Sequence, residues 1–399
     1  MDFIGVVCEY NPFHNGHAYH LRESARLTDD QGVVCVMSGD FVQRGEAALY
    51  AKYARAEAAV RGGADVVFEL PLPWSLASAE GFARGTVGLL AAIGATTLSF
   101  GTESEGLGIL DTLARRLIEP QTVELIRAKM ADEPELSFAA ARQRVLEELC
   151  GEGARALETP NNILAVEYLK TIYTENLSLK PLGVRRLGSA HDGAGEGNTR
   201  SASEIRSLLL RGESADRFMG AAARAVLERD TAQGRGIPSR AAIETAILSR
   251  LRMLRREDFL ALPDASGGLG ERLFRAAGEE PTLDAVLAAV KNKRLAMSRV
   301  RRACYCAALG ITSNAADGIP PYARLLAANA RGREMLAELK ETSAVPIVTK
   351  PASVRELGER SETIFSLGAA AHDLYVLGYR AAEERRGGAD WRSGPRIVE

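Results

Sequence analysis

Four short apolar runs in the first hundred residues constrain the fold more than any other feature. They are residues 3–9 (FIGVVCE), 33–37 (VVCVM), 65–70 (DVVFEL) and 97–101 (TLSFG). Helical stretches separate them at residues 16–25, 50–62 and 75–92. Because the runs lack the two-residue alternation of a half-exposed strand, they are typical of a parallel sheet with helices on both faces. The sequence therefore predicts a doubly wound α/β fold, which binds ligands beyond the carboxyl ends of its strands, where the strand order reverses.

The remainder of the chain is predominantly helical. Residues 107–176 are helical and charged, and an expected fifth strand follows at 182–187, so this stretch is predicted to be a helical insertion. Beyond a Gly- and Pro-containing segment at 233–238 the pattern is almost entirely helical, apart from a short apolar run at 345–349. With 399 residues, the chain is expected to form at least two domains, 1–235 and 236–399.

Composition excludes several classes of protein. The 50 basic and 52 acidic residues nearly balance, so a nucleic-acid contact would need a local basic patch. Five scattered cysteines, with no C-x-x-C pair, predict neither a disulfide framework nor a cysteine zinc site and favour a reducing cytoplasm. We expect neither secretion nor a membrane span, because no leader pattern and no long apolar stretch occur.

The first strand runs into "CEYNPFHNGHAYHLRES", which holds three of the five histidines. An Asn-Pro pair ends the strand, and His14 to His17 form the first turn of a helix, whose free N–H groups favour an anion. Gly16 allows a close backbone approach, and two imidazoles there suit a phosphate undergoing displacement. A zinc site built from His14, His17 and His20 is one alternative, although helical zinc pairs are typically four residues apart. Surface histidines in a turn are another.

Three further segments are candidates for binding or catalysis. "SASEIR" at 201–206 is first a helix-capping motif and second a phosphate-binding one. His191 and Asp192, in a glycine-rich loop, form either an acid–base pair or an exposed turn. Basic residues crowd residues 291–302 and suit RNA phosphates, although such a run is also typical of a solvated helix face.

Longer stretches resemble one known family. They are "VVCEYNPFHNGHAYHL", "VMSGDFVQRGEAALYAKYARAEAAVRGGADVVFELPLPWSLASAEGFARGTVGLL", "SFGTE", "TPNNILAVEYLK", "GVRRLGSAHD", "SASEIR" and "KRLAMSRVRRACYCAALGIT". Together they resemble the bacterial tRNA(Met) cytidine acetate ligase family of the HxGH nucleotidylyltransferase superfamily. The resemblance is weakest after about residue 315. Two positions depart from the family pattern, with Asp40 in place of an expected Asn and Ala47 in place of a common Pro.

The resemblance implies a Rossmann-like ATP-binding domain over 1–235 and a tRNA-binding domain over 236–399. It implies that acetate attacks the α-phosphate of ATP and that the wobble cytidine of elongator tRNA(Met) then takes the acetyl group from acetyl-adenylate, giving N4-acetylcytidine. His14 and His17 would be catalytic. Imidazoles, arginines and Mg²⁺ are expected to supply the positive charge.

The expected site residues fall into three sets. The ATP-binding set is Val7, Cys8, Glu9, Tyr10, Asn11, Pro12, Phe13, His14, Asn15, Gly16, His17, Ala18, Tyr19, His20, Gly101, Asn161 or Asn162, and Arg185 or Arg186. The candidate pyrophosphate-binding set is Ser201, Ser203 and Arg206. The candidate tRNA-binding set is Lys291, Lys293, Arg294, Arg299, Arg301 and Arg302. No metal ligand is assigned.

Two alternatives stay open at this point. One is a nucleotidylyltransferase acting on a small phosphorylated metabolite or cofactor precursor, against which the large helical basic second half argues. The other is a nucleotide-dependent RNA-binding factor without catalysis, against which the intact His14, Gly16 and His17 argue.

Overall fold

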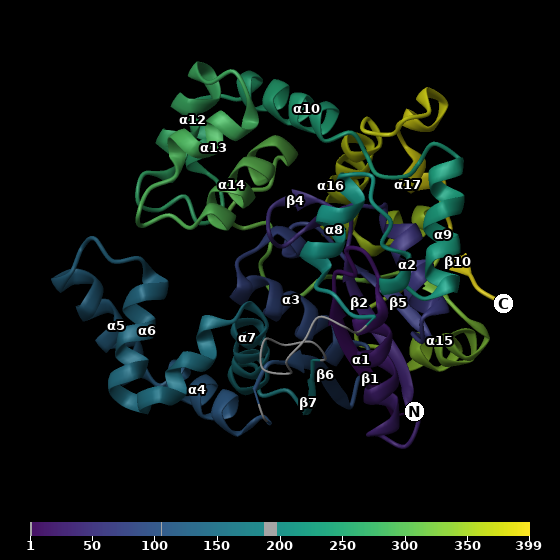
Figure 1. Cartoon of the computed structure of the whole chain (residues 1–399), viewed down its shortest axis with the longest axis horizontal. Helices are drawn as coiled ribbons and strands as arrows, with labels where there is room; N and C mark the ends of the chain where they lie inside the picture. Colours follow the sequence, from purple (N-terminus) through teal and green to yellow (C-terminus); the bar gives the residue numbers. More distant parts are fainter. Residues whose placement is uncertain (1, 105, 187–197) are drawn as a thin grey trace.

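An eight-stranded sheet forms the centre of the molecule (Figure 1). The computed structural model describes residues 2–104, 106–186 and 198–399. The strands run in the order β10-β8-β5-β2-β1-β6-β7, with β9 beside β8. Their bounds are β1 Phe3–Cys8, β2 Gly32–Ser38, β5 Val66–Leu70, β6 Thr97–Thr102, β7 Lys180–Arg185, β8 Ala323–Ala328, β9 Ile347–Val348 and β10 Arg396–Ile397.

The strand order reverses at β1. From β1 the chain moves to β2 and β5 on one side, and then to β6 and β7 on the other, with every one of these pairs parallel. Ile4 pairs with Val33 on one side and with Thr97 on the other. The predicted doubly wound parallel sheet is confirmed. Ligands in such sheets bind at the reversal, here beyond the carboxyl ends of β1 and β6.

Helices cover both faces of this sheet, as predicted. Those that follow β1, β2 and β5 are α1 Asn15–Arg26, α2 Lys52–Arg61 and α3 Ala79–Ala92. Side chains of α1 and α2 pack with Ile4 and Val6 on one face, whereas those of α3 pack with Phe3 on the other. A short hairpin between β2 and α2 consists of β3 Phe41–Val42 and β4 Glu46–Ala47.

The expected insertion is helical, and its last helix packs against α3. Its helices are α4 Gly108–Ile118, α5 Pro120–Asp132, α6 Phe138–Cys150 and α7 Pro160–Thr174. In Figure 1, α5 and α6 project away from the sheet, whereas α7 lies beside it. No helix in the described parts of the chain is both long and apolar enough to cross a bilayer.

The second half begins as a helical unit with its own core. After α8 Ala202–Leu210 and α9 Ala221–Ala232, the unit comprises α10 Arg240–Met253, α11 Arg256–Leu260, α12 Leu269–Glu279, α13 Leu283–Val290 and α14 Met297–Leu309. Its buried side chains also contact Phe41 of the hairpin and Tyr375 of the later helix α16 (Glu359–Val376). The unit is therefore joined to the sheet on the side that carries the hairpin.

The last part of the chain adds strands to the sheet, and these strands were not predicted from the sequence. Strand β8 pairs antiparallel with β5, and β9 and β10 lie parallel to β8. The sheet thus crosses the boundary expected near residue 235. Because β8 reads ARLLAA, its alanines and leucines resemble the surrounding helical composition. The last helices are α15 Ala330–Thr342, α16 and α17 Ala389–Arg392.

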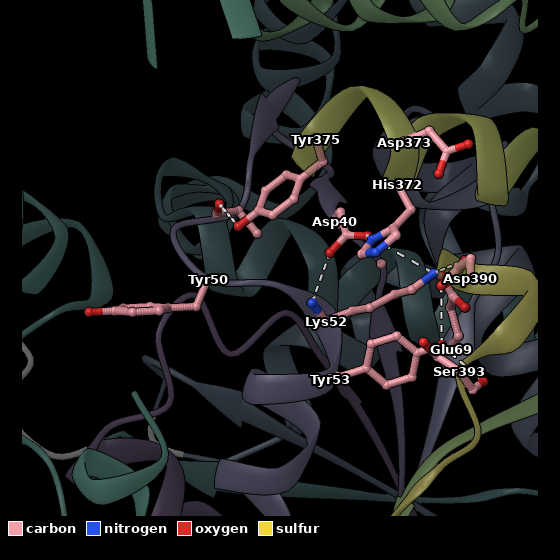
Figure 2. Close-up of polar contacts among 12 residues, drawn as sticks. Asp40, Tyr50, Lys52, Tyr53, Glu69, His372, Asp373, Tyr375, Asp390 and Ser393 are labelled. Atoms are coloured by element: carbon pink, nitrogen blue, oxygen red, sulfur yellow. Dashed lines mark hydrogen bonds and ion pairs between the residues drawn. The ribbon is translucent and has the colours of Figure 1, made fainter. Parts of the chain in front are cut away.

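A cluster of buried charges ties this last segment to the first strands (Figure 2). Lys52 Nζ lies 2.8 Å from Glu69 Oε1 and 2.6 Å from Asp390 Oδ2. Arg324 Nη1 lies 2.7 Å from Asp390 Oδ2 and 3.0 Å from Glu69 Oε2. All four residues are at most 6% exposed. Two cations and two anions therefore compensate one another out of contact with solvent.

Replacing Lys52 by Met should destabilise the protein by about 3–5 kcal/mol, because Glu69 and Asp390 would then share one cation while still buried. Urea unfolding followed by circular dichroism measures the change. Arg116→Ala, which breaks an exposed 3.0 Å pair with Glu119, is the matched control and should cost less than about 1 kcal/mol. Equal losses in both variants would contradict this account of the cluster.

Candidate active site

A tight turn links β1 to α1 at the reversal of the strand order. Tyr10 adopts the left-handed conformation, with φ of 45°, and the Asn11–Pro12 peptide is cis. The Asn11 side-chain oxygen accepts from the Leu49 N–H at 2.7 Å, and its carbonyl accepts from Arg206 Nη1 at 2.9 Å. A left-handed conformation is unfavourable for tyrosine, and these contacts from two other segments hold it.

Two histidines begin helix α1. Nδ1 of His14 accepts from the Gly16 N–H at 3.1 Å, and Nδ1 of His17 accepts from the His14 N–H at 3.3 Å. The rings stack with their centroids 3.6 Å apart. Because both Nδ1 atoms are acceptors, the proton of each neutral ring is on Nε2. His14 Nε2 is buried and has no hydrogen-bond partner among the described residues. The turn therefore holds imidazole N–H donors at a helix N-terminus.

The histidines are neutral in this environment. Burial lowers the pKa of His14 to about 3, aided by the charges of Arg186 and Arg206. Burial and the neighbouring His14 lower the pKa of His17 well below its usual range. Burial and Arg186 lower that of His20 to about 4. Without a ligand the three imidazoles are therefore uncharged near neutral pH, and the positive charges beside them are those of Arg186 and Arg206.

His20 lies one turn further along α1 and is already partnered. Its Nε2 lies 3.0 Å from Ser99 Oγ of β6, and Ser99 Oγ also lies 2.7 Å from Ser24 Oγ. Among the described residues, no three His, Cys, Asp or Glu side chains gather as metal ligands would. His20 thus joins α1 to β6.

Residues on or next to β6, α7 and β7 form the side of the candidate site opposite the histidine turn. Arg186 is partly buried beside Gly101, where an added Cβ would lie 3.2 Å from Arg186 Cγ. Arg186 Nη1 lies 3.5 Å from Asn161 Oδ1, and Asn161 Nδ2 donates to Glu103. After burial, the charge of Arg186 contributes to the lowered pKa values of all three α1 histidines, so this guanidinium is close enough to the histidine turn to act on it.

The other member of each residue pair occupies a different position. Asn162 is buried, accepts from the Glu103 N–H at 3.0 Å and donates to Ser104 Oγ at 3.0 Å. It thereby fixes the loop after β6. Arg185 is exposed at the end of β7. The geometry therefore favours Asn161 and Arg186 as the members that face the histidines.

The other residues of the 7–20 segment divide into core and surface. Cys8, Tyr10 and Phe13 are buried with α1 and α2 and build the turn from within. Val7 packs against the core on the other face, and Pro12 is buried. Asn15 Nδ2 donates to the carbonyls of Asn198 and Arg217 at 2.8 and 3.0 Å. Ala18 and Tyr19 are partly buried on α1.

The SASEIR segment forms the start of α8, as its capping pattern predicts. Ser201 Oγ accepts from the Glu204 N–H, and Glu204 accepts from the Ser201 N–H in return. Arg206 Nη2 donates to Ser203 Oγ at 3.2 Å and lies 3.5 Å from Glu46 of the hairpin. The capping role of Ser201 is thus observed, and Arg206 joins α8 to the histidine turn. His191 and Asp192 lie outside the described residues.

The basic stretch 291–302 is only partly available to a ligand. Lys291, Lys293 and Arg294 are exposed immediately before α14. Arg299 Nη2 donates to the Asp264 carbonyl at 2.6 Å and to Ser266 Oγ at 2.8 Å. Arg301 and Arg302 are partly buried on α14, where their backbone contacts the hairpin at residue 45.

Arg55 of α2 is a further residue near the turn, and it was not predicted from the sequence. This arginine is fully buried and donates to the carbonyls of Tyr50, Glu9, Ser38 and Gly39. It thereby fixes the carboxyl ends of β1 and β2. An arginine in a helical pattern normally indicates a solvated face. Arg55, however, has an alanine on each side in KYARAEAAVR, which is compatible with a buried arginine.

Comparisons with known proteins identify the family of the chain. The family described as HIGH Nucleotidyl Transferase matches residues 1–390. A protein of Syntrophotalea carbinolica named tRNA(Met) cytidine acetate ligase is 37% identical over 382 residues, covering 91% of this chain and 89% of its own. One of the same name from Thermosipho melanesiensis is 32% identical over 417 residues, covering 98% of both chains. The chain belongs to the tRNA(Met) cytidine acetate ligase family of HIGH nucleotidyl transferases.

Solved structures of this family have the same fold over the whole chain. The crystal structure of Thermotoga maritima TmcAL bound with alpha-thio ATP superposes with a TM-score of 0.92 at 30% identity, covering 100% of both chains. The apo crystal form superposes with a TM-score of 0.93, also at 30% identity and over 100% of both chains. The predicted family and the predicted fold class are therefore confirmed.

The histidine pKa values give a test that needs no ligand. In an NMR titration of the ring signals, His14 and His20 should not change protonation between pH 5 and 8, because their pKa values are about 3 and about 4. His17 should titrate well below pH 6.5, because burial and the neighbouring His14 lower its pKa. His372 should titrate above its ordinary 6.5, because its ion pair with Asp40 outweighs the effect of burial on its pKa. Single histidine variants assign the signals, including that of His191. A transition of His14 or His17 near pH 6.5 would contradict the neutral pair.

Proposed function

We propose that the protein is an ATP-dependent ligase that acetylates the exocyclic amine of the wobble cytidine in elongator tRNA(Met), forming N4-acetylcytidine through acetyl-adenylate. The observation that carries the proposal is the N–H-donating histidine pair at the start of α1, flanked by Arg186 and Arg206, in a chain that matches the ligase family over nearly its full length. We propose that His14 and His17 are the catalytic residues of the first step.

The first step joins two anions. An acetate oxygen attacks the α-phosphorus, the bond to the bridging oxygen breaks, and pyrophosphate leaves with the electron pair. The site needs positive charge and fixed donors more than it needs a strong base. Arg186 and Arg206 would supply the charge, and the Nε2–H groups of His14 and His17 would donate to phosphate oxygens.

The remaining assignments are part of the same proposal. Residues 7–20, Gly101, Asn161 and Arg186 would form the ATP site, and Ser203 and Arg206 would face the pyrophosphate. Mg²⁺ would accompany ATP and neutralise phosphate charge, and it would be held mainly by phosphate oxygens, since the described residues do not form a cage of acidic ligands. The location would be the cytoplasm, where tRNA is modified.

The tRNA surface is proposed to lie on the second half of the chain. The exposed cations Lys291, Lys293 and Arg294 precede α14, and α14 contacts the hairpin beside the ATP site. Electrostatic contacts from such residues to RNA phosphates position a substrate without reading its sequence. Arg301 and Arg302 would contribute mainly by supporting the hairpin, because they are partly buried.

ATP/pyrophosphate exchange tests the function directly. The wild-type protein should exchange label only when acetate is present, and His17→Ala should lose this exchange by at least about 100-fold, because the ring donates to the developing charge. Unchanged folding of the variant is checked by circular dichroism. Exchange that needs a phosphorylated metabolite instead of acetate would favour nucleotidyl transfer to a small molecule and contradict the ligase.

The second half-reaction is tested with labelled acetate and tRNA(Met). A double variant Lys293→Ala with Arg294→Ala should lower transfer to tRNA and raise the KM for tRNA, while acetate-dependent exchange stays near the wild-type rate. His17→Ala serves as the comparison, because it should lose both acetate-dependent exchange and transfer to tRNA. Equal loss of exchange and transfer in the double variant would place the tRNA surface elsewhere.

Gly16 gives a test of ATP binding. An added Cβ at Gly16 would lie 2.9 Å from His14 Cε1, so Gly16→Ala should displace the His14 ring and weaken ATP binding by at least about tenfold. Calorimetry with ATP measures the affinity. Gly368→Ala in α16 is the matched control, because an added Cβ there has no neighbour within 4 Å among the described residues. Wild-type affinity in Gly16→Ala would remove His14 from the phosphate site.

A further inference from the structure

Glu9 lies at the reversal of the strand order, directly after β1. The side chains of β1 alternate between the two faces of the sheet, so Glu9 projects to the same face as Val7. That face is covered by α3 and α7, whereas the α1 histidine turn lies on the other. Burial, and after it the charge of Glu9, raises the pKa of Tyr168 on α7, which is consistent with a Glu9 carboxylate on the α7 side of the sheet. Glu9 is therefore at the carboxyl end of β1, where the strand order reverses, on the face opposite the histidine turn.

Both ends of Glu9 are fixed. Its Oε1 accepts from the Gln43 N–H of the hairpin at 2.8 Å, and its carbonyl accepts from Nη1 of the buried Arg55. Among the described residues, its other carboxylate oxygen accepts no hydrogen bond, and the carboxylate forms no ion pair. The carboxylate is held in place while retaining a lone pair for a ligand.

The surroundings make Glu9 a stronger base than an ordinary glutamate. Burial raises its pKa, and the hydrogen bond from Gln43 and the charges of Arg44 and Arg55 lower it only in part. The neighbouring Glu46 raises it further. These groups and Tyr168 are the titratable and charged residues that face Glu9 from the hairpin, α2 and α7.

The hairpin above Glu9 reaches the basic helix. Gly45 at its tip has φ of 73°, and an added Cβ would lie 2.5 Å from the backbone nitrogen of Arg302 on α14. Gln43 of the same hairpin holds Glu9, and Glu46 contacts Arg206 of the ATP site. The hairpin that holds Glu9 therefore contacts both Arg206 of the proposed ATP site and α14, the helix that follows the cations proposed to bind tRNA.

Other candidate bases are occupied. The Nδ1 atoms of His14 and His17 accept backbone N–H groups, and their Nε2 atoms carry the protons. Glu103 accepts from Asn161, and Glu46 is paired with Arg206. Of these three glutamates near the end of β1, Glu9 alone has no hydrogen bond or ion pair with a side chain among the described residues.

We propose that Glu9 is the general base of acetyl transfer, accepting the proton of the cytidine amine as that amine attacks acetyl-adenylate. This rests on the proposed function. The amine nitrogen forms a bond to the acetyl carbon, and the bond from that carbon to the phosphate oxygen breaks. AMP leaves with the electron pair, and the nitrogen's proton goes to the Glu9 carboxylate and then to solvent. A cytidine amine is hardly basic, so its proton must be removed as the bond forms.

Glu9→Gln tests the proposal with little change in structure, because the amide oxygen can still accept from the Gln43 N–H. Transfer from supplied acetyl-adenylate to tRNA(Met) should fall by at least about 100-fold in kcat, with a much smaller change in the KM for tRNA. Because Glu9 belongs to the proposed ATP segment, acetate-dependent ATP/pyrophosphate exchange is measured on the same variant as the reference, and transfer should fall at least about tenfold more than exchange does. Glu9→Asp should recover part of the transfer rate, since it restores a carboxylate.

The pH profile and a neighbouring variant separate a base from a structural role. Transfer by the wild type should rise with pH and level off, and Glu9→Gln should lack that rise. Glu46→Gln is the matched control, because it loosens Arg206 and should change both half-reactions together. Parallel losses of exchange and transfer in Glu9→Gln, or an unchanged pH profile, would overturn the proposal. Wild-type protein without acetate-dependent exchange would instead overturn the proposed function itself.

Discussion

The buried cluster of Lys52, Glu69, Arg324 and Asp390 is the interaction on which the rest of the architecture depends. Removing four charges from water is costly, and it is tolerated only while every charge has its partner. Two of these residues belong to the first strands and helices and two to the last eighty residues of the chain. The C-terminal segment is therefore a required part of the sheet domain, even though the helical unit α10–α14 separates it in sequence.

Helix α2 connects the cluster to the candidate active site. Lys52 and Arg55 are three residues apart on this helix, and Arg55 holds the carboxyl ends of β1 and β2 through their carbonyls. Next to the cluster, Asp40 lies 2.7 Å from His372 of α16 (Figure 2). The resemblance leads us to expect Asn at position 40. Asp40 forms an ion pair with His372 and raises the pKa of that histidine. The aspartate that replaces the expected Asn is therefore paired within the fold.

Much of the fold could be predicted because apolar strands and capped helices leave local patterns. The five parallel strands β1, β2, β5, β6 and β7 were all expected close to their observed bounds. Strand β8 was not, because its pairing with β5 depends on contacts across 250 residues that no local pattern records. The site shows the same limit. The histidine motif identified the turn, but the protonation states of its rings and the inward-facing members of the Asn161/Asn162 and Arg185/Arg186 pairs depend on burial and on neighbours brought in by folding.

Neutral imidazoles suit a site that must hold several phosphate species in turn. A pair of cationic rings 3.6 Å apart would repel each other and would favour the most highly charged ligand, which is the triphosphate or the released pyrophosphate. Neutral N–H donors lose less when the ligand's charge falls from that of ATP to the single negative charge of an acyl-adenylate. Arg186 follows β7 and Arg206 lies on α8, on elements separate from the turn. In the proposed mechanism these arginines would favour binding of the triphosphate, while the histidines would hold the α-phosphate through both steps. The histidines are neutral donors because they are buried, and the positive charges lie on neighbouring elements. In a more exposed turn the histidine pKa values would be higher, and the rings would become charged as well.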